Sequence, residues 1–148
     1  MLLFGRSRSR RGLACALIGE IAAVIDGMES FEEVRKLEDL EIGADEHLDE
    51  LSAFTLPKFA VYESNADRLD LFDPTIERQI AYFFTRAGSL AGHLHALALT
   101  KNESKELCKQ HAIDAQKEIN GLWELGDDLL RGLRKLVSKK QPRTISRA

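Results

Sequence analysis

Residues 102–138, NESKELCKQHAIDAQKEINGLWELGDDLLRGLRKLVS, carry an apolar or small side chain at alternating steps of four and three residues. These side chains are Cys108, Ala112, Ala115, Ile119, Leu122, Gly126, Leu129, Leu133 and Leu136. The spacing places them on one face of a helix, whereas a strand has a period of two residues. We therefore expect one long helix that packs along its length, with its small residues letting a neighbouring helix approach closely.

A second segment, residues 74–99, shows the same spacing of apolar side chains. Asp73 followed by Pro74 is typical of a helix start, with an N-cap residue and then proline at the first helical position. Thr100 and Glu103 have the spacing of a capping box and predict where the next helix begins. So short a connection forces the two helices to lie side by side and antiparallel, as a helical hairpin.

The same spacing rule predicts two more helices, a long one over residues 13–40 and a short one over residues 57–69. The predicted fold class is all-α, an antiparallel bundle of three long helices and one short helix that ends in a long helical hairpin. We divide the chain into a basic N-terminal arm (1–12), a helical bundle domain (13–138) and a basic C-terminal tail (139–148).

The composition suits one folded domain with an uneven charge distribution. The chain has 148 residues, 44% of them apolar, and two cysteines, which excludes a disordered chain and a disulfide scaffold. Residues 1–12 hold four basic residues and residues 131–148 hold seven, with no acidic residue in either. Residues 13–130 hold ten basic and all 24 acidic residues. The net charge of −3 therefore hides two basic ends around an acidic middle.

The basic ends are expected to attract polyanions, either lipid headgroups or nucleic acid, over about 8–10 Å. Solvated chain ends without a partner are the alternative interpretation. If helices 13–40 and 74–99 run parallel, the last helix returns its basic tail to the N-terminal arginines; the opposite route puts the two clusters at opposite poles. The candidates for binding an anionic surface are Arg6, Arg8, Arg10, Arg11, Arg131, Arg134, Lys135, Lys139 and Lys140.

No apolar run approaches the ~20 residues that a membrane-spanning helix needs. The longest candidate, residues 13–25, contains Glu20. Residues 1–4 are too short for the core of a signal peptide, and the arginines follow them instead of preceding them. Taken by itself, the sequence predicts a cytoplasmic chain whose cysteines are reduced.

Few residues point to chemistry. Cys108 and His111, three residues apart on one helix face, are the candidate zinc ligands. Because Cys108 lies on the apolar stripe, a buried thiol beside a histidine at the edge of the core is the favoured interpretation. His93 and His95 point about 200° apart on a helix and cannot share a metal ion by themselves. With no phosphate-binding loop and no nucleophile motif in the sequence, we expect no catalytic residue, metal or cofactor.

The most distinctive local run is residues 59–74, FAVYESNADRLDLFDP. It resembles a segment in a loose group of uncharacterised bacterial single-pass membrane proteins. In that group an N-terminal transmembrane helix is followed by an arginine-rich stretch and by a helix rich in alanine and leucine with a Glu-Ile pair. Here residues 6–11 and Glu20-Ile21 occupy these places, and the spanning helix has no counterpart. The resemblance implies a helical cytosolic domain and carries no known activity.

Asn65 and Arg68 lie three residues apart in this run. We expect them to tie the short helix to the start of the next one, with Arg68 paired to Asp73 or a nearby acidic residue. A ligand pocket around these residues is the alternative.

The predicted function is that of a non-enzymatic helical interaction or scaffold module at the inner face of a bacterial membrane. Its basic ends would contact lipid, and a helix face would bind a protein partner or a second copy of the chain. One alternative is a metal-binding protein or enzyme that uses Cys108 and His111, with His93 or His95. Another is nucleic-acid binding through the basic ends, although they lack the interleaved aromatic residues typical of such proteins.

Overall fold

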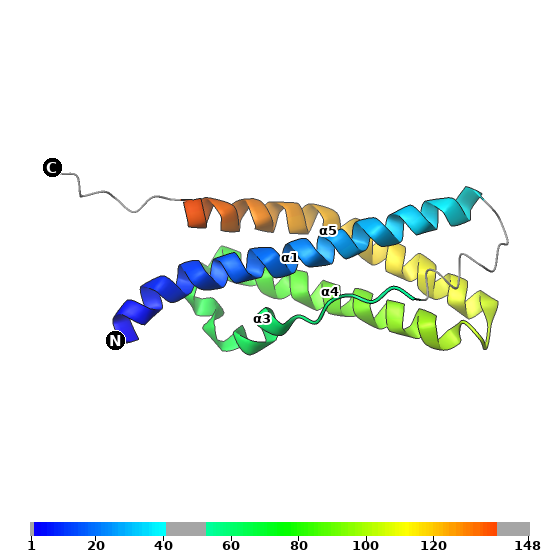
Figure 1. The fold of residues 1–148 in the computed structure, drawn as a ribbon, viewed down its shortest axis with the longest axis horizontal. Helices are drawn as coiled ribbons and strands as arrows, with labels where there is room; N and C mark the ends of the chain where they lie inside the picture. Colours follow the sequence, from blue (N-terminus) through cyan, green and yellow to red (C-terminus); the bar gives the residue numbers. More distant parts are fainter. Residues whose placement is uncertain (1, 41–52, 139–148) are drawn as a thin grey trace.

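The structure, a computed structural model, describes residues 2–40 and 53–138, with side chains for residues 10–33 and 53–138. All its regular elements in these ranges are helical, with no strand among them, which confirms the all-α class (Figure 1). In chain order they are α1 (Leu2–Leu40), the short α3 (Ala60–Ser64), the 3-10 helix η1 (Ala66–Leu71), α4 (Pro74–Thr100) and α5 (Lys105–Ser138).

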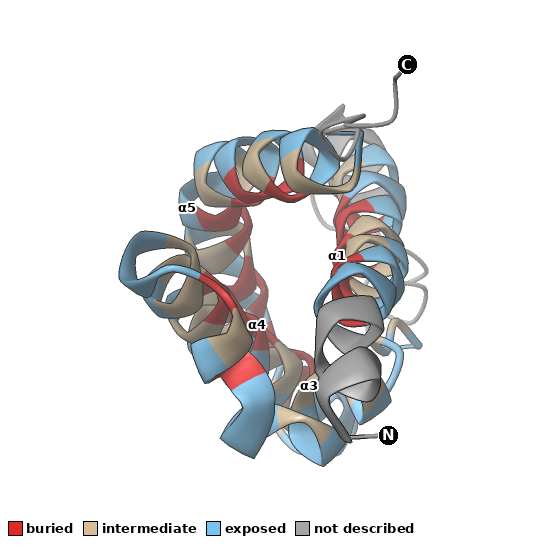
Figure 2. Cartoon of the chain, turned by 90° about the vertical axis from the view of Figure 1, so that its left-hand side faces the viewer, coloured by how far each residue is buried: buried red, intermediate tan, exposed pale blue. Residues whose placement is uncertain are grey.

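The three long helices form an antiparallel bundle. Helices α1 and α4 run in the same direction, and α5 returns in the opposite direction as the second arm of a hairpin (Figure 1). Helix α5 packs against both α4 and α1. On the other side of the bundle, α3 contacts α1 and η1 contacts α4, so this short segment closes the gap between the two parallel helices (Figure 2).

The core lies along the apolar stripes that the sequence indicates. In α5 every expected stripe residue is buried except Leu136, which is half-buried near the end of the helix. In α4 the buried side chains run from Ile80 to Leu97 at the expected spacing. The close approach expected at Gly126 is also present, because an added Cβ would lie 3.0 Å from Ile25 Cδ1 and 3.1 Å from Phe83 Cε1.

The predicted starts of α1 and α5 are wrong. Helix α1 begins at Leu2 instead of residue 13, so the backbone of the basic arm is continuous with the bundle helix. The reason is that leucine and arginine favour helices and no proline interrupts this stretch. The capping box at Thr100 is also incorrect, because Thr100 stays in α4 and donates to Ala96 O at 2.8 Å. The cap of α5 is Ser104, whose Oγ accepts from Leu107 N at 3.2 Å.

The short helix predicted over residues 57–69 is in fact two pieces. Residues 54–59 are not helical, and α3 and η1 meet at Asn65, whose φ of −124° lies outside the helical range. Helix α3 spans only five residues, too few for a helix to be stable by itself. Its position therefore depends on contacts with the long helices.

Candidate functional site

The two basic segments meet at one end of the bundle. Arg11 Nη2 donates a hydrogen bond of 2.7 Å to the backbone oxygen of Val137. That oxygen is one of the last carbonyls of α5, which have no partner within the helix, so Arg11 caps α5 from α1. The N-terminal part of α1 and the end of α5 consequently lie at the same end of the bundle (Figure 1). Of the two routes that the sequence left open, the structure has the one with both clusters at the same pole.

The described basic side chains at this end are exposed to solvent: Arg10, Arg11, Arg131, Arg134 and Lys135. A shallow hollow of about 490 Å³ lies along the last turns of α5, and its lining includes Arg131, Arg134 and Lys135. Asp127 also lines this hollow, and Asp128 pairs with Arg131 at 3.2 Å. The side chains of Arg6, Arg8, Lys139 and Lys140 lie outside the described part of the chain.

Glu20 holds the short segment on α1. Its Oε2 accepts from Val61 N and its Oε1 accepts from Tyr62 N, both at 2.8 Å. These N–H groups belong to the first turn of α3, where a helix has no internal acceptors. The carboxylate therefore caps a helix that lies about forty positions away in the sequence. Local pattern gives no signal of this contact, because the cap is not next to the helix that it caps.

Aromatic rings hold the same segment on α4. Tyr62 stacks on Phe84 with ring centroids 4.5 Å apart and an interplanar angle of 13°. Phe59 meets the same ring edge-on at 5.4 Å. Both distances lie in the range in which aromatic pairs attract each other. With Glu20 on one side and Phe84 on the other, the segment is a wedge between α1 and α4.

Asn65, Arg68 and Asp73 act locally. Asn65 Nδ2 donates to Val61 O at 2.8 Å, and Arg68 Nη1 donates to Asn65 Oδ1 at 3.1 Å. Asp73 Oδ1 accepts from Ile76 N at 3.0 Å, which confirms its role as the N-cap of α4. Arg68 thus pairs with Asn65 in this structure, in place of the expected pairing with Asp73, whose carboxylate caps α4.

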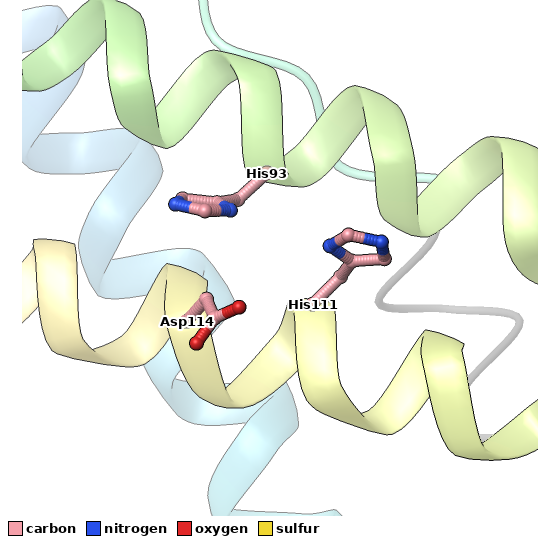
Figure 3. A group of neighbouring side chains, drawn as sticks. All are labelled: His93, His111 and Asp114. Carbon is pink, nitrogen blue, oxygen red and sulfur yellow. The ribbon is translucent and has the colours of Figure 1, made fainter.

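A group of possible metal ligands lies between α4 and α5 (Figure 3). His93 comes from α4, while His111 and Asp114 come from α5, and one ligand atom of each lies within 4.8 Å of the other two. The two imidazole centroids are 6.4 Å apart. His111 Nδ1 is buried and has no hydrogen-bond partner among the described residues. Gln110 Nε2 donates to Asp114 Oδ1 at 3.1 Å.

This group differs from the pair that the sequence suggested. Cys108 is 1% exposed, and its Sγ lies 3.8 Å from Leu97 O in the core, so the thiol belongs to the apolar stripe as expected. His111 faces His93 across the hairpin, whereas His95 is exposed. Asp114 was not among the candidate ligands that the sequence suggested. Its spacing of three residues from His111 was the available signal, but only the register of the hairpin shows which α4 side chain faces them.

Arg86 links the same two helices farther along the bundle. Its Nη1 donates to Tyr82 Oη at 3.2 Å, and its Nε lies 3.4 Å from Glu118 Oε2 on α5. The hydrogen bond to Tyr82, together with the negative charge of Glu118, raises the pKa of Arg86 above its ordinary value. A raised pKa means that this contact is complete below the ordinary pKa of arginine and is lost only at still more alkaline pH. Arg86 therefore joins α4 to α5 throughout the neutral range.

Comparison with protein-family models gives no match for this chain, and searches of curated proteins and of solved structures also give no significant match. Within the described ranges, no helix is long and apolar enough to cross a membrane.

Proposed function

We propose that this chain is a non-enzymatic helical interaction module whose basic end binds an anionic membrane surface. The observation that carries the proposal is the 2.7 Å hydrogen bond from Arg11 to Val137 O. It brings positive side chains from the first turns of α1 and the last turns of α5 to the same pole, where they act on one surface together. If the two basic patches lay at opposite poles, only one of them could contact a given membrane surface.

The electrostatic free energy expected for these basic side chains supports a reversible contact with the membrane. A basic side chain near an anionic lipid surface contributes about 1 kcal/mol, and the attraction falls off within about 8–10 Å. Among the described residues, the exposed basic side chains at this pole belong to Arg10, Arg11, Arg131, Arg134 and Lys135. The sequence adds Leu2, Leu3 and Phe4 in the first turn of α1, and apolar residues beside basic ones are typical of segments that bind at the lipid interface.

The remainder of the bundle favours contact through this end. Residues 13–130 hold all 24 acidic residues of the chain against ten basic ones. A hollow of about 330 Å³ beside α1 and α5 is lined by Glu29, Glu32, Glu33 and Trp123. These acidic sides are repelled by any polyanion. A flat lipid surface accommodates contact by one pole, whereas a nucleic-acid strand is usually bound along a basic groove with stacking aromatic residues, and that difference favours lipid.

The position of Cys108 disfavours the alternative of an enzyme that uses this thiol as its nucleophile. A reactive cysteine needs an accessible thiolate, but this sulfur is buried against Leu97 O. We therefore propose that the chain acts by binding and not by catalysis.

The test is co-sedimentation with vesicles that contain phosphatidylglycerol, compared with vesicles of pure phosphatidylcholine, over a series of salt concentrations. We expect binding to the anionic vesicles only, weakening as salt rises. The double variant Arg134→Gln/Lys135→Gln removes two charges from the basic pole, which should weaken binding about 25-fold at ~1 kcal/mol per charge. The matched control, Lys109→Gln/Lys117→Gln, removes two exposed charges from the other half of α5 and should leave binding unchanged.

Duplex DNA is titrated under the same salt conditions as the vesicles. Tighter binding to DNA than to anionic vesicles would replace this proposal with the nucleic-acid alternative. Equal weakening by the two double variants, or no binding to anionic vesicles at low salt, would also overturn it.

A further inference from the structure

We infer that His93, His111 and Asp114 form a binding site for a divalent transition-metal ion, Zn²⁺ by its donor set, across the α4–α5 hairpin. One ligand atom of each side chain lies within 4.8 Å of the other two (Figure 3). The inference is independent of the proposed membrane contact, because the basic pole contains none of these three residues.

The hairpin brings the three side chains together. His111 and Asp114 are three residues apart in α5, so they project from the same face of the helix. His93 stands seven residues before the end of α4, and His111 stands six residues after the start of α5. In an antiparallel hairpin with a short turn, residues at such matched depths face each other. The site is therefore a consequence of the packing of α4 against α5.

The donor set suits zinc. Two imidazole nitrogens and one carboxylate oxygen are a common set of three protein ligands, with water at the fourth position. Ligand atoms around a tetrahedral zinc ion lie about 3.3 Å apart, given bonds of ~2.0–2.1 Å, so the present group needs to close by roughly 1.5 Å at most. All three side chains are half-buried, which leaves them room to rotate toward a common centre.

Two further observations point to a ligand at this place. His111 Nδ1 is buried without a hydrogen-bond partner among the described side chains and backbone, and nearly all buried polar atoms in proteins have one. A metal ion would provide that partner. The second is that Gln110 Nε2 donates to Asp114 Oδ1 at 3.1 Å, and a hydrogen bond of this kind helps to orient a carboxylate that binds a metal.

Metal binding here would link α4 to α5 near the turn of the hairpin at residues 101–104. Because the ligands come together only in the folded chain, zinc should raise the midpoint of thermal unfolding as its free concentration rises. The predicted role of the metal ion is thus to stabilise the contact between α4 and α5 in the half of the bundle farther from the basic end.

The experiment uses the full chain after treatment with a chelator. Isothermal titration calorimetry with Zn²⁺ should show one ion per chain. Binding should be lost in His93→Ala and in His111→Ala, and it should be weakened at least roughly tenfold in Asp114→Asn. His95→Ala is the matched control, because this exposed histidine lies two residues from His93 and outside the group, and it should bind zinc like the unchanged chain.

Cys108→Ala distinguishes this site from the pair that the sequence suggested. The proposal requires that this variant keeps its zinc, whereas a site built on Cys108 and His111 would lose it. If a histidine variant fails to fold, NMR of the unchanged chain gives the same answer. Zinc should shift the ring signals of His93 and His111 and leave those of His95 in place. No zinc binding, binding that survives His93→Ala, or loss in Cys108→Ala would each overturn the inference.

Discussion

The Glu20 carboxylate accepts two backbone hydrogen bonds of 2.8 Å, from Val61 N and Tyr62 N, on a helix too short to hold its own conformation. Glu20→Ala leaves both N–H groups without this acceptor. A hydrogen bond to a charged group contributes about 1.5–3 kcal/mol, so we expect the free energy of unfolding to fall by about 2–3 kcal/mol in urea titrations. Amide hydrogen exchange at Val61 and Tyr62 should also become faster.

Asp26→Ala is the matched control for this change, because Asp26 is an exposed acidic residue on the same helix. Its removal should alter the free energy of unfolding by no more than about 0.5 kcal/mol. Glu20→Gln keeps one acceptor oxygen and should fall between the two. Equal losses in Glu20→Ala and Asp26→Ala would show that the general charge of α1, and not the cap, is responsible.

The candidate metal site was accessible from the sequence only in part. His111 and the histidines of α4 stand out as residue types, and the spacing of Cys108 on the apolar stripe correctly indicates that its thiol faces the core. Which of His93 and His95 faces His111 on α5 depends on how α4 is rotated and on how far it is shifted along α5. The apolar spacing of each helix alone does not give this shift. Asp114 is marked in the sequence only by its spacing of three residues from His111, and its closeness to His93 depends on the register of the hairpin.

At the scale of the helices, Gly126 of α5 lies where all three long helices pack together. An added Cβ would lie 3.0 Å from Ile25 Cδ1 of α1 and 3.1 Å from Phe83 Cε1 of α4. A larger side chain therefore has to displace two buried residues at once. We expect Gly126→Leu to lower the free energy of unfolding by about 1–3 kcal/mol, the usual effect of overpacking, as measured by chemical denaturation.

Gly92→Ala serves as the comparison in another long helix. Nothing lies within 4 Å of an added Cβ at Gly92, so only the helix preference of alanine acts there. The free energy of unfolding should rise by roughly 0.5–1 kcal/mol. A stabilised Gly126→Leu variant would contradict the close packing at this point.

The long helices were predictable because each repeats its apolar stripe over many turns. The buried stripe of α5 from Cys108 to Leu133 follows the expected spacing, and Asp73 caps α4 as its sequence indicates. The segment between Thr55 and Leu71 was not predictable in the same way. Its cap is Glu20 on another helix and its anchor is the ring of Phe84, so its form is set by contacts that local pattern does not contain.

At the scale of the whole molecule, the direction of α4 relative to α1 decides where the basic ends lie. Both directions are compatible with the stripes and with a short hairpin turn, which is why the sequence left the choice open. The contact of Arg11 with Val137 O fixes one end of the α1–α5 pair, and Ile25 against Gly126 fixes its middle. These two contacts share one antiparallel register, so the basic pole is a property of the packing and not of the chain ends alone.

A paramagnetic label tests this arrangement directly. Cys15 is exposed and Cys108 is buried, so a nitroxide reagent should react with Cys15 near the basic pole. By the α1–α5 register, residues 131–138 lie beside the label, whereas the hairpin turn at residues 101–104 lies roughly 45 Å away, at 1.5 Å per helical residue. In NMR spectra the label should therefore broaden the amide signals of residues 131–138 and spare those of the turn.

A label at the opposite end of the bundle gives the converse test. In a Cys15→Ser background, a nitroxide on Asn102→Cys at the turn should broaden the signals around the turn and spare residues 131–138. If the Cys15 label instead broadened the turn and spared the end of α5, the bundle would have the opposite topology. The basic clusters would then lie at opposite poles, and because the proposed membrane contact needs their charges within about one Debye length of the same surface, it would fail with the topology.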